Sequence, residues 1–216
     1  MNQYSISILS DRDSWITPGL SELKELWSEQ GHSVLIRHEL SEELNGDFCF
    51  CLSFGKILPA PILSNFKHVL VVHESDLPNG KGWSPLTWQI IEGKNLIPVS
   101  LFEAAKDVDS GPIYAQKFLH FRGDELVDEL RMGQFKLTKE LCIWFIQEYP
   151  DSLNFKKPQN RDNGSYYPRR HPIDSELDPH KTIYDQFNLL RTVDNDNYPA
   201  FFLINDNRYE IKIYKA

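Results

Sequence analysis

The chain has 216 residues, of which 41% are hydrophobic, and it carries a formal net charge of -8 at pH 7. This length predicts one ordinary domain with a small appendage, and the hydrophobic content is enough for a buried core. The negative charge argues against a nucleic-acid partner, because a polyanion would be repelled, but local basic patches could still bind a small anionic ligand.

Membrane and secretory signals are missing from the sequence. No apolar run reaches the roughly 18 residues of a membrane-spanning helix, and residues 1–9 lack both the basic and the apolar part of a signal peptide. We therefore expect a cytoplasmic protein with no membrane partner. The three cysteines, Cys49, Cys51 and Cys142, are expected to be reduced and buried. Cys49 and Cys51 share one predicted strand and cannot meet disulfide geometry there.

The chain up to Gly93 alternates predicted strands and helices, which is typical of a parallel sheet. Thr17-Pro18 is typical of a helix start, with the helix running to about Gln30, and Ser84-Pro85 starts a second helix. The loop over 10–16 contains no glycine, which argues against the glycine-rich cradle of an NAD or ATP site. Strands are predicted over residues 4–10, 33–38, 47–53 and 67–72.

The middle of the chain predicts two strands and a long helix. The apolar runs over 97–102 and 113–119 are joined by a segment with the turn-forming residues D-S-G-P, which is typical of a hairpin. From 124 to 149 the apolar residues follow helical spacing, and Pro150 ends the pattern. This helix is expected to cover one face of the sheet.

The last third of the chain predicts a small extension. Residues 151–172 are rich in Asn, Lys, Pro, Gly and Arg and have the composition of a linker. A helix is predicted over 181–193, followed by two strands around the turn N-D-N, at 200–204 and 209–214. We therefore predict an α/β fold: a Rossmann-like, mostly parallel sheet in residues 1–150, and a linker with a small helix plus β-hairpin extension in 151–216.

His73 and Asp109 are the strongest candidates for chemistry. His73 follows the strand predicted over 67–72, and ligands bind at the carboxyl ends of strands in open α/β sheets. Asp109 lies in the predicted hairpin turn, which could return an acid to one edge of the site. A carboxylate beside an imidazole fixes its tautomer and favours its charged form. Taken alone, His73 could equally be bonded to backbone, and Asp109 could simply form its turn.

Three segments around these residues resemble the catalytic core of the folate-dependent formyltransferases, including the methionyl-tRNA formyltransferases. They are S-F-G-K-I-L-P from Ser53, H-E-S-D-L-P from His73, and V-D-S-G-P-I, which contains Asp109. The resemblance extends over residues 47–116 and returns over 187–194. The chain is most similar to the short nucleotide-sugar N-formyltransferases, particularly the pseudaminic-acid-pathway type with its G-W-S-P-L-T-W-Q. Residues 1–150 would then form the catalytic domain.

The resemblance implies that a formyl group moves from N10-formyltetrahydrofolate to a nucleotide-linked amino-dideoxy sugar, UDP-linked with a 4-amino-4,6-dideoxy ring. His73 would take a proton from the amine and protonate the leaving nitrogen, with Asp109 orienting the imidazole. The family usually carries an asparagine two residues before the histidine, where its amide holds the formyl oxygen, but this chain has Val71. Backbone N–H groups over 75–77, protonated His73 or another side chain are left open as replacement donors.

The resemblance also implies where the two substrates bind, with the pterin held mainly by backbone near 53–58 and 99–108. The residues expected at this cosubstrate are Ser53, Phe54, Gly55, Lys56, Ile57, Leu58, Leu77 and Pro78. Cationic and aromatic candidates for the acceptor are Arg12, Trp15, Lys81, Trp83, Tyr166, Tyr167, Arg169 and Arg170. For the arginine pair, a solvated linker is the alternative. No metal site is predicted, because the histidines lack ligand spacing.

Three other functions are possible from the sequence: two other formyltransferases and a binding module without activity. A glycinamide ribonucleotide formyltransferase is expected to have a glycine- and serine-rich first loop, whereas the loop here is S-D-R-D-S-W. A methionyl-tRNA formyltransferase is expected to extend past residue 216 into a basic domain. A catalytically dead folate- or sugar-binding module would explain Val71, but the presence of both His73 and Asp109 favours an enzyme. The sequence leaves a monomer and a homodimer open.

Overall fold

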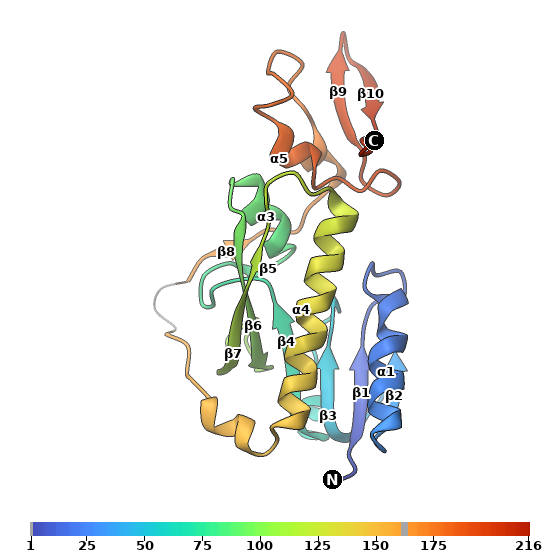
Figure 1. Ribbon diagram of the computed structural model, residues 1–216, viewed down its shortest axis with the longest axis vertical. Coiled ribbons are helices and arrows are strands. Elements are labelled where there is room, and N and C mark those ends of the chain that lie inside the picture. Colours follow the sequence, from blue (N-terminus) through green and yellow to red (C-terminus); the bar gives the residue numbers. More distant parts are fainter. Residues whose placement is uncertain (1, 161–163) are drawn as a thin grey trace.

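The computed structural model describes residues 2–160 and 164–216. At its centre lies a six-stranded sheet in the order β2-β1-β3-β4-β6-β7 (Figure 1). Strands β1 to β4 run parallel, whereas β6 is antiparallel to both β4 and β7. The prediction of an α/β fold with a mostly parallel sheet is therefore confirmed. The strands are β1 (Ser5–Leu9), β2 (Ser33–Arg37), β3 (Gly46–Cys51), β4 (Phe66–His73), β6 (Leu96–Glu103) and β7 (Ile113–His120).

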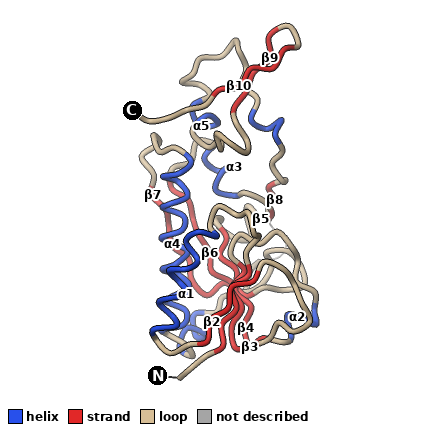
Figure 2. Tube along the Cα trace, turned by 90° about the vertical axis from the view of Figure 1, so that its right-hand side faces the viewer, coloured by secondary structure: helices blue, strands red, loops and turns tan. Residues whose placement is uncertain are grey.

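Helices cover both faces of the sheet (Figure 2). Helices α1 (Leu20–Glu29) and α4 (Val127–Gln147) lie on one face, and the short α2 (Ala60–Ser64) lies on the other. Alternate residues of β3 serve the two faces: Phe48 and Phe50 join the core beneath α1 and α4, and Cys49 and Cys51 join the core beneath α2. This alternation is the side-chain period of a strand that is buried on both sides.

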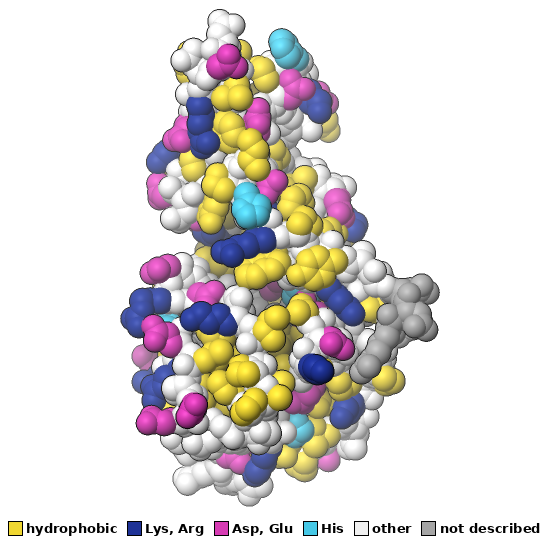
Figure 3. Space-filling view, turned by 180° about the vertical axis from the view of Figure 1, so that it is seen from behind, with side chains coloured by type: hydrophobic (Ala, Val, Ile, Leu, Met, Phe, Trp, Pro, Cys, Tyr) yellow, Lys and Arg dark blue, Asp and Glu magenta, His cyan; other side chains and the backbone are white. Residues whose placement is uncertain are grey.

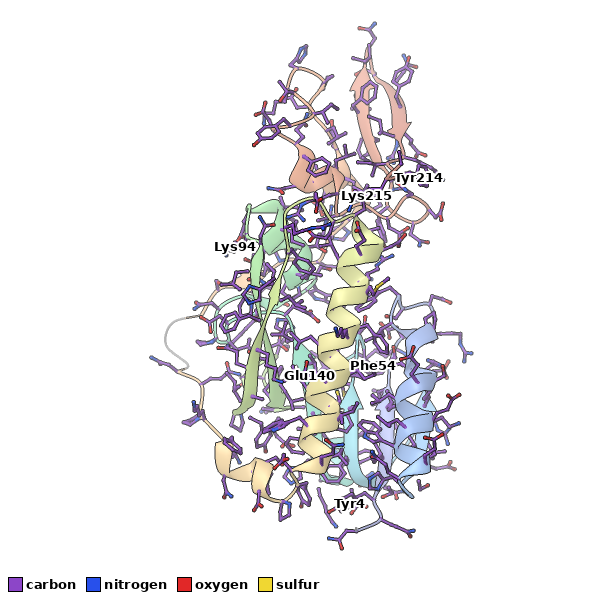
Figure 4. The ribbon with its side chains drawn as sticks, in the orientation of Figure 1. Tyr4, Phe54, Lys94, Glu140, Tyr214 and Lys215 are labelled. Atoms are coloured by element: carbon purple, nitrogen blue, oxygen red, sulfur yellow. The ribbon has the colours of Figure 1, made fainter. Side chains whose placement is uncertain are left out.

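The carboxyl-terminal extension has a small core of its own, formed by Leu177, Leu190, Val193 and Ala200. Figure 1 shows its hairpin at the end of the molecule opposite the amino terminus. Near the carboxyl terminus, Lys215 forms an ion pair of 2.6 Å with Glu129 of α4, which ties the extension to the main helix (Figure 4). A domain boundary at residue 150 stays a prediction. The elements are α5 (Phe187–Leu190), β9 (Ala200–Ile204) and β10 (Asn207–Ile211).

The segment predicted as a linker over 151–172 contains paired backbone, which corrects that prediction. Strand β8 (Tyr166–Tyr167) pairs in parallel with β5 (Lys81–Gly82), and a 3-10 helix covers Asp151–Phe155. Composition did not reveal the pairing because backbone groups form it, including the N–H of Lys81, which donates to the carbonyl of Ser165 at 3.0 Å. Residues 161–163 of the predicted linker lie outside the described residues.

The last helix is shorter than predicted. Only Phe187–Leu190 is α-helical within the predicted range of 181–193. Side chains ahead of it bind the backbone locally: Gln186 Nε2 donates to the carbonyl of Asp178 at 3.0 Å, and the hydroxyl of Thr182 accepts from the backbone N–H of Asp185 at 3.1 Å. Such local bonds compete with helix formation, so the apolar spacing alone predicted too long a helix.

Three smaller expectations also differ from the structure. Neither Thr17 nor Ser84 caps its helix through its side chain. The Thr17 hydroxyl donates instead to the carbonyl of Asp11 at 2.9 Å, and Ser84 adopts a left-handed backbone with φ of 47° ahead of α3 (Pro85–Ile91). The last strand ends at Ile211, before the predicted end at 214.

The three cysteines are buried free thiols, as predicted. Burial raises the pKa of the Cys142 thiol, which lies in α4 against the sheet. Over residues 2–160 and 164–216, no helix combines the length and the apolar character that crossing a membrane requires.

Replacement of Leu141 tests how α4 packs on the sheet. Leu141 is fully buried, whereas Met132 of the same helix is 72% exposed. We expect Leu141→Ala to lower the free energy of unfolding by about 2–5 kcal/mol, because lost burial and a new cavity both contribute. Met132→Ala should change it by less than about 0.5 kcal/mol. Urea unfolding followed by circular dichroism measures both, and equal losses would contradict this placement of α4.

Candidate active site

A cavity of about 620 Å³ lies at the carboxyl ends of the parallel strands. Figure 4 shows Tyr4, which precedes β1, at the opposite end of the sheet from Phe54, which follows β3 and lines the cavity. The walls come from the loops after β1 and β3, the end of β4, the turn after β6, one face of α4 and part of the carboxyl-terminal extension. A crevice at this edge is the usual binding place in open α/β sheets.

His73 is the last residue of β4 and is only 7% exposed. Its Nε2 lies 2.8 Å from the carbonyl oxygen of Gly80. Since a carbonyl only accepts, the hydrogen-bond network assigns a proton to Nε2 and leaves Nδ1 as the basic nitrogen of the neutral ring. The sequence predicted that Asp109 fixes the tautomer. The structure corrects this, because the carbonyl of Gly80 holds the ring proton.

Asp109 lies in the turn between β6 and β7, with a left-handed φ of 48°. Its Oδ2 accepts a hydrogen bond from the backbone N–H of Gly82 at 2.8 Å and lies 3.7 Å from Nε2 of His73. The turn can close only with glycine at Gly111, because a Cβ there would lie 1.7 Å from the carbonyl oxygen of Glu103. The hairpin thus brings the acid beside the imidazole, at a distance too long for a direct hydrogen bond.

A second carboxyl lies directly after the histidine. Glu74 is 9% exposed and lines the cavity. Its Oε1 accepts a hydrogen bond from Nε2 of Gln134 on α4 at 2.7 Å. Burial raises the pKa of the Glu74 carboxyl, although the nearby His73 and the Gln134 hydrogen bond act in the opposite direction. A carboxyl of this kind gives up its proton less readily than an exposed one.

A third carboxyl, that of Asp194, comes from the carboxyl-terminal extension. It accepts a hydrogen bond from Nη2 of Arg131 on α4 at 2.9 Å, and both residues line the cavity. Burial opposes its ionisation, but hydrogen bonds from Asn197 and Arg131 outweigh burial and hold the pKa of Asp194 at about 2. Within the described part of the chain, no group of three or more His, Cys, Asp or Glu side chains is arranged to hold a metal ion.

Comparison with known proteins identifies the family. The formyl transferase family model matches residues 22–141, which is more than half of the chain. The chain belongs to the formyl transferase family. The methionyl-tRNA formyltransferase of Lactobacillus delbrueckii subsp. bulgaricus is 29% identical over 181 residues, covering 82% of this chain and 56% of the relative. The chain thus spans little more than half the length of this curated relative.

Solved structures share the fold of this chain. A methionyl-tRNA formyltransferase of Clostridium thermocellum superposes with a TM-score of 0.78 at 23% identity, covering 95% of this chain and 90% of that one. A sugar N-formyltransferase of a Shewanella species gives 0.67 at 15% identity, covering 97% and 96%. HypX of Aquifex aeolicus, solved in complex with tetrahydrofolic acid, gives 0.72 at 16% identity, covering 96% and 37%.

Most residues predicted at the cosubstrate line the cavity. Ser53, Phe54, Gly55, Lys56, Ile57 and Leu58 all do so. The backbone N–H of Gly55 donates to Oδ2 of Asp11 at 3.0 Å, which ties this loop to the loop after β1. Leu77 and Pro78 are not among the lining residues, and their place at the cosubstrate stays a prediction. Leu77 is turned into the interior and is 5% exposed.

The residues predicted at the acceptor divide into two groups. Those that line the cavity are Trp15, Trp83, Tyr166, Arg169 and Arg170. Arg12, Lys81 and Tyr167 do not line it. The hydroxyl of Tyr167 donates to Glu92 at 2.9 Å and its ring stacks on Trp88, so this side chain braces α3. Arg12 is exposed in the loop after β1, and Lys81 contributes backbone to the β5–β8 pairing.

The two predicted arginines lie over aromatic rings. The guanidinium of Arg169 lies 4.8 Å from the ring centre of Trp83, and that of Arg170 lies 5.8 Å from the ring centre of Trp88. Nη2 of Arg170 donates to the carbonyl of Asp174 at 3.0 Å, while its buried Nε has no hydrogen-bond partner among the described residues. Figure 3 shows hydrophobic and cationic side chains gathered around the recess at mid-height.

Several lining residues were not predicted. Arg131, Gln134 and Thr138 form a polar stripe on the cavity side of α4, and Tyr198 and Asp194 reach the cavity from the extension. The stripe had a signal in the sequence, because polar residues spaced three and four apart interrupt the apolar face of a helix that covers a sheet. Asp194 ends the segment 187–194 over which the resemblance returns, whereas Tyr198 had no sequence signal, since only the tertiary fold brings it to the cavity.

Val71 also lines the cavity, two residues before His73 on the same side of β4. It offers an aliphatic side chain where the resemblance implies an amide. One of the replacement donors left open by the sequence is already used, because the N–H of Ser75 donates to the carbonyl of His73 at 2.9 Å.

The ion pair at the cavity predicts a pH-dependent stability. The depressed pKa of Asp194, about 2, means that its contribution is present above the unfolded value near 4 and is lost as the pH falls toward 2. Asp194→Asn should therefore be about 2 kcal/mol less stable than the parent at pH 6, with the gap shrinking toward pH 2. Asp196→Asn, at a position 84% exposed and paired with Lys212 at the surface, is the control and should change stability by less than about 1 kcal/mol. A constant gap across this range would contradict the assignment.

Proposed function

We propose that this formyl transferase moves the formyl group of N10-formyltetrahydrofolate to the amino group of a nucleotide-linked amino sugar. The observation that carries the proposal is the buried imidazole of His73 with the Asp109 carboxylate 3.7 Å from its Nε2. The cavity of about 620 Å³ around them is within the range of small-molecule sites. Membership in the formyl transferase family supports the reaction class.

His73 supplies the proton transfers of this reaction. An imidazole near neutrality can take a proton from the attacking amine and return it to the leaving nitrogen. The carbonyl of Gly80 keeps the ring in one orientation through the 2.8 Å hydrogen bond to Nε2. The carboxylate of Asp109 stabilises the imidazolium that forms in between. N10-formyltetrahydrofolate supplies the formyl group. The protein supplies His73 as the base, and the Gly80 carbonyl orients its ring while the Asp109 carboxylate balances its charge.

The folate donor fits the loop over 53–58 and the turn over 102–109. Both segments line the cavity with apolar side chains, including Ile57 and Val108, although Lys56, Asp107 and Asp109 of the same segments also line it. Ile57 is 68% exposed and Val108 is 40% exposed, so apolar surface is open to solvent at this side of the cavity. A flat heteroaromatic ring laid against them would remove that surface from water.

The acceptor fits the side of the cavity that carries Trp83, Tyr166, Arg169 and Arg170. Arginine donates two parallel hydrogen bonds to phosphate oxygens, as a nucleoside diphosphate requires. The aromatic rings offer faces for a base. Structural likeness to a sugar N-formyltransferase supports a sugar acceptor. The narrower proposal of a UDP-linked 4-amino-4,6-dideoxy sugar rests on the sequence resemblance to the pseudaminic-acid-pathway type.

His73→Asn is expected to lower the turnover number by about 10²- to 10⁴-fold, because general acid–base catalysis contributes that much. The parent and the variant would be supplied with N10-formyltetrahydrofolate and a UDP-linked 4-amino-4,6-dideoxyhexose, and the formylated product measured by mass spectrometry. His120→Asn is the matched control, since His120 is exposed at the end of β7. Unchanged turnover in the His73 variant would remove this residue from the mechanism.

Nucleotide binding can be measured separately from formyl transfer. Calorimetric titration with UDP is expected to show binding that is stronger than with dTDP. The double variant Arg169→Ala, Arg170→Ala should weaken UDP binding at least tenfold, because a charge-assisted hydrogen bond contributes about 1.5–3 kcal/mol. Arg12→Ala, outside the cavity lining, is the control and should bind UDP like the parent. If neither nucleotide binds and the double variant still formylates normally, the nucleotide-sugar acceptor is wrong.

A methionyl-tRNA acceptor is the second candidate, favoured by the 29% identity to a methionyl-tRNA formyltransferase. The formal net charge of -8 weighs against it, since a polyanionic acceptor needs a basic surface. The formylation assay therefore includes an arm with methionyl-tRNA. A product in that arm and none with the amino sugar would replace the proposed acceptor.

A further inference from the structure

Glu74 is a buried acid that the proton transfers described so far do not use. It follows His73 directly, lines the same cavity and is 9% exposed. Gln134 Nε2 donates to its Oε1 at 2.7 Å, and no other side chain of the described residues donates to this carboxyl. Its backbone is fixed separately, because Nε2 of Gln89 on α3 donates to the Glu74 carbonyl at 2.5 Å. The Glu74 carboxyl is thus held in place, and its oxygens can accept further hydrogen bonds.

A purely structural role does not require an acid at this position. A glutamine at position 74 would offer Gln134 the same carbonyl acceptor without the cost of burying an ionisable group, which is several kcal/mol for a charged carboxylate. The burial that raises the pKa of Glu74 also makes its carboxylate a stronger base than an exposed one. The position therefore has the properties of a proton acceptor within a cavity.

The proposed reaction needs such a group. An aliphatic amine is an ammonium ion at neutral pH, as the reference pKa of about 10.4 for lysine illustrates. The ammonium must lose one proton before its nitrogen has a free electron pair, and the same nitrogen loses a second proton after it bonds to the formyl carbon. His73 can hold only one of them at a time, and that one is returned to the leaving nitrogen of the donor.

We propose that Glu74 binds the ammonium group of the acceptor and takes its first proton. This inference rests on the proposed function and adds a second base to the same site. The carboxylate accepts the proton, the freed electron pair bonds to the formyl carbon, and the bond from that carbon to the donor nitrogen breaks. His73 moves the second proton to the donor nitrogen. Glu74 then releases its proton to solvent, so the products are the formamide, tetrahydrofolate and one proton.

The charged groups around Glu74 are arranged in a way that fits proton transfer from the acceptor ammonium to its carboxylate. On β4 and its loop, His73 is the adjacent titratable group, and from the β6–β7 turn Asp109 raises the pKa of Glu74 while His73 lowers it. On α4 the partner Gln134 is neutral, and the cation of that helix that lines the cavity, Arg131, is paired with Asp194 of the extension. Glu74 is thus influenced electrostatically by His73 and Asp109, while the guanidinium of Arg131 on α4 is already paired with Asp194.

The test is the pH profile of Glu74→Gln, which keeps the volume and the Gln134 hydrogen bond. We would measure kcat/KM for a UDP-linked 4-amino-4,6-dideoxyhexose from pH 6 to pH 10, with saturating N10-formyltetrahydrofolate. At pH 7 the variant should be about 100-fold slower than the parent. Its kcat/KM should rise about tenfold per pH unit until the free amine predominates in solution, so that the gap closes at high pH. Tetrahydrofolate binding, measured by calorimetry, should be unchanged.

The control is Asp76→Asn, two residues further on, where the side chain is exposed and bonded to Gln116. Its pH profile should match that of the parent. A Glu74 variant that equals the parent at every pH, or that is slower by the same factor at every pH, would overturn the inference. A parent that formylates no amine would instead contradict the proposed function, and the role of Glu74 would fall with it.

Discussion

The hydrogen bond from the backbone N–H of Gly82 to Oδ2 of Asp109, 2.8 Å long, is the constraint on which the site depends. It joins the loop after β4 to the turn after β6. Gly82 is itself paired with Tyr167 of the extension, and Gly80, two residues earlier, holds the ring of His73. A bond to an ionised carboxylate is among the stronger hydrogen bonds of a protein, so one contact fixes both the acid and the loop that orients the base.

The strand order explains how the acid reaches the histidine. β6 runs antiparallel to β4, passes His73 at Ser100 and ends beside Leu70 at Glu103. The N–H of Ala104 then donates to the carbonyl of Val69 at 2.7 Å, and the turn runs back toward His73 before β7 begins. A β7 parallel to β6 would have needed a crossover connection in place of this turn. The antiparallel strands β6 and β7 therefore place Asp109 beside His73, and the loops after the parallel strands enclose the cavity.

The sequence predicted what depends on local chemistry and missed what depends on tertiary pairing. His73 was found because a polar segment follows a buried strand, and Asp109 because turn residues separate two apolar runs. The partner of the imidazole could not be found in this way, since the acceptor is the carbonyl of Gly80 and every residue has a carbonyl. The β5–β8 pairing was hidden for the same reason. Gln134 was visible as a polar residue on an apolar face, but only the structure shows that it meets Glu74.

Because the side chain of Val71 has no hydrogen-bond donor, the proposed reaction needs another group to stabilise the charge on the formyl oxygen. The developing oxyanion needs a donor, and losing one such donor costs about 10²- to 10³-fold in rate. The side chain of Val71 offers none, and the N–H of Ser75 is already bonded to the carbonyl of His73. An imidazolium at His73 is then the cation that the reaction itself creates beside the formyl carbon. Because Asp109 lies 3.7 Å from that ring, in the proposed reaction this pair contributes both to charge stabilisation and to the transfer of the second proton.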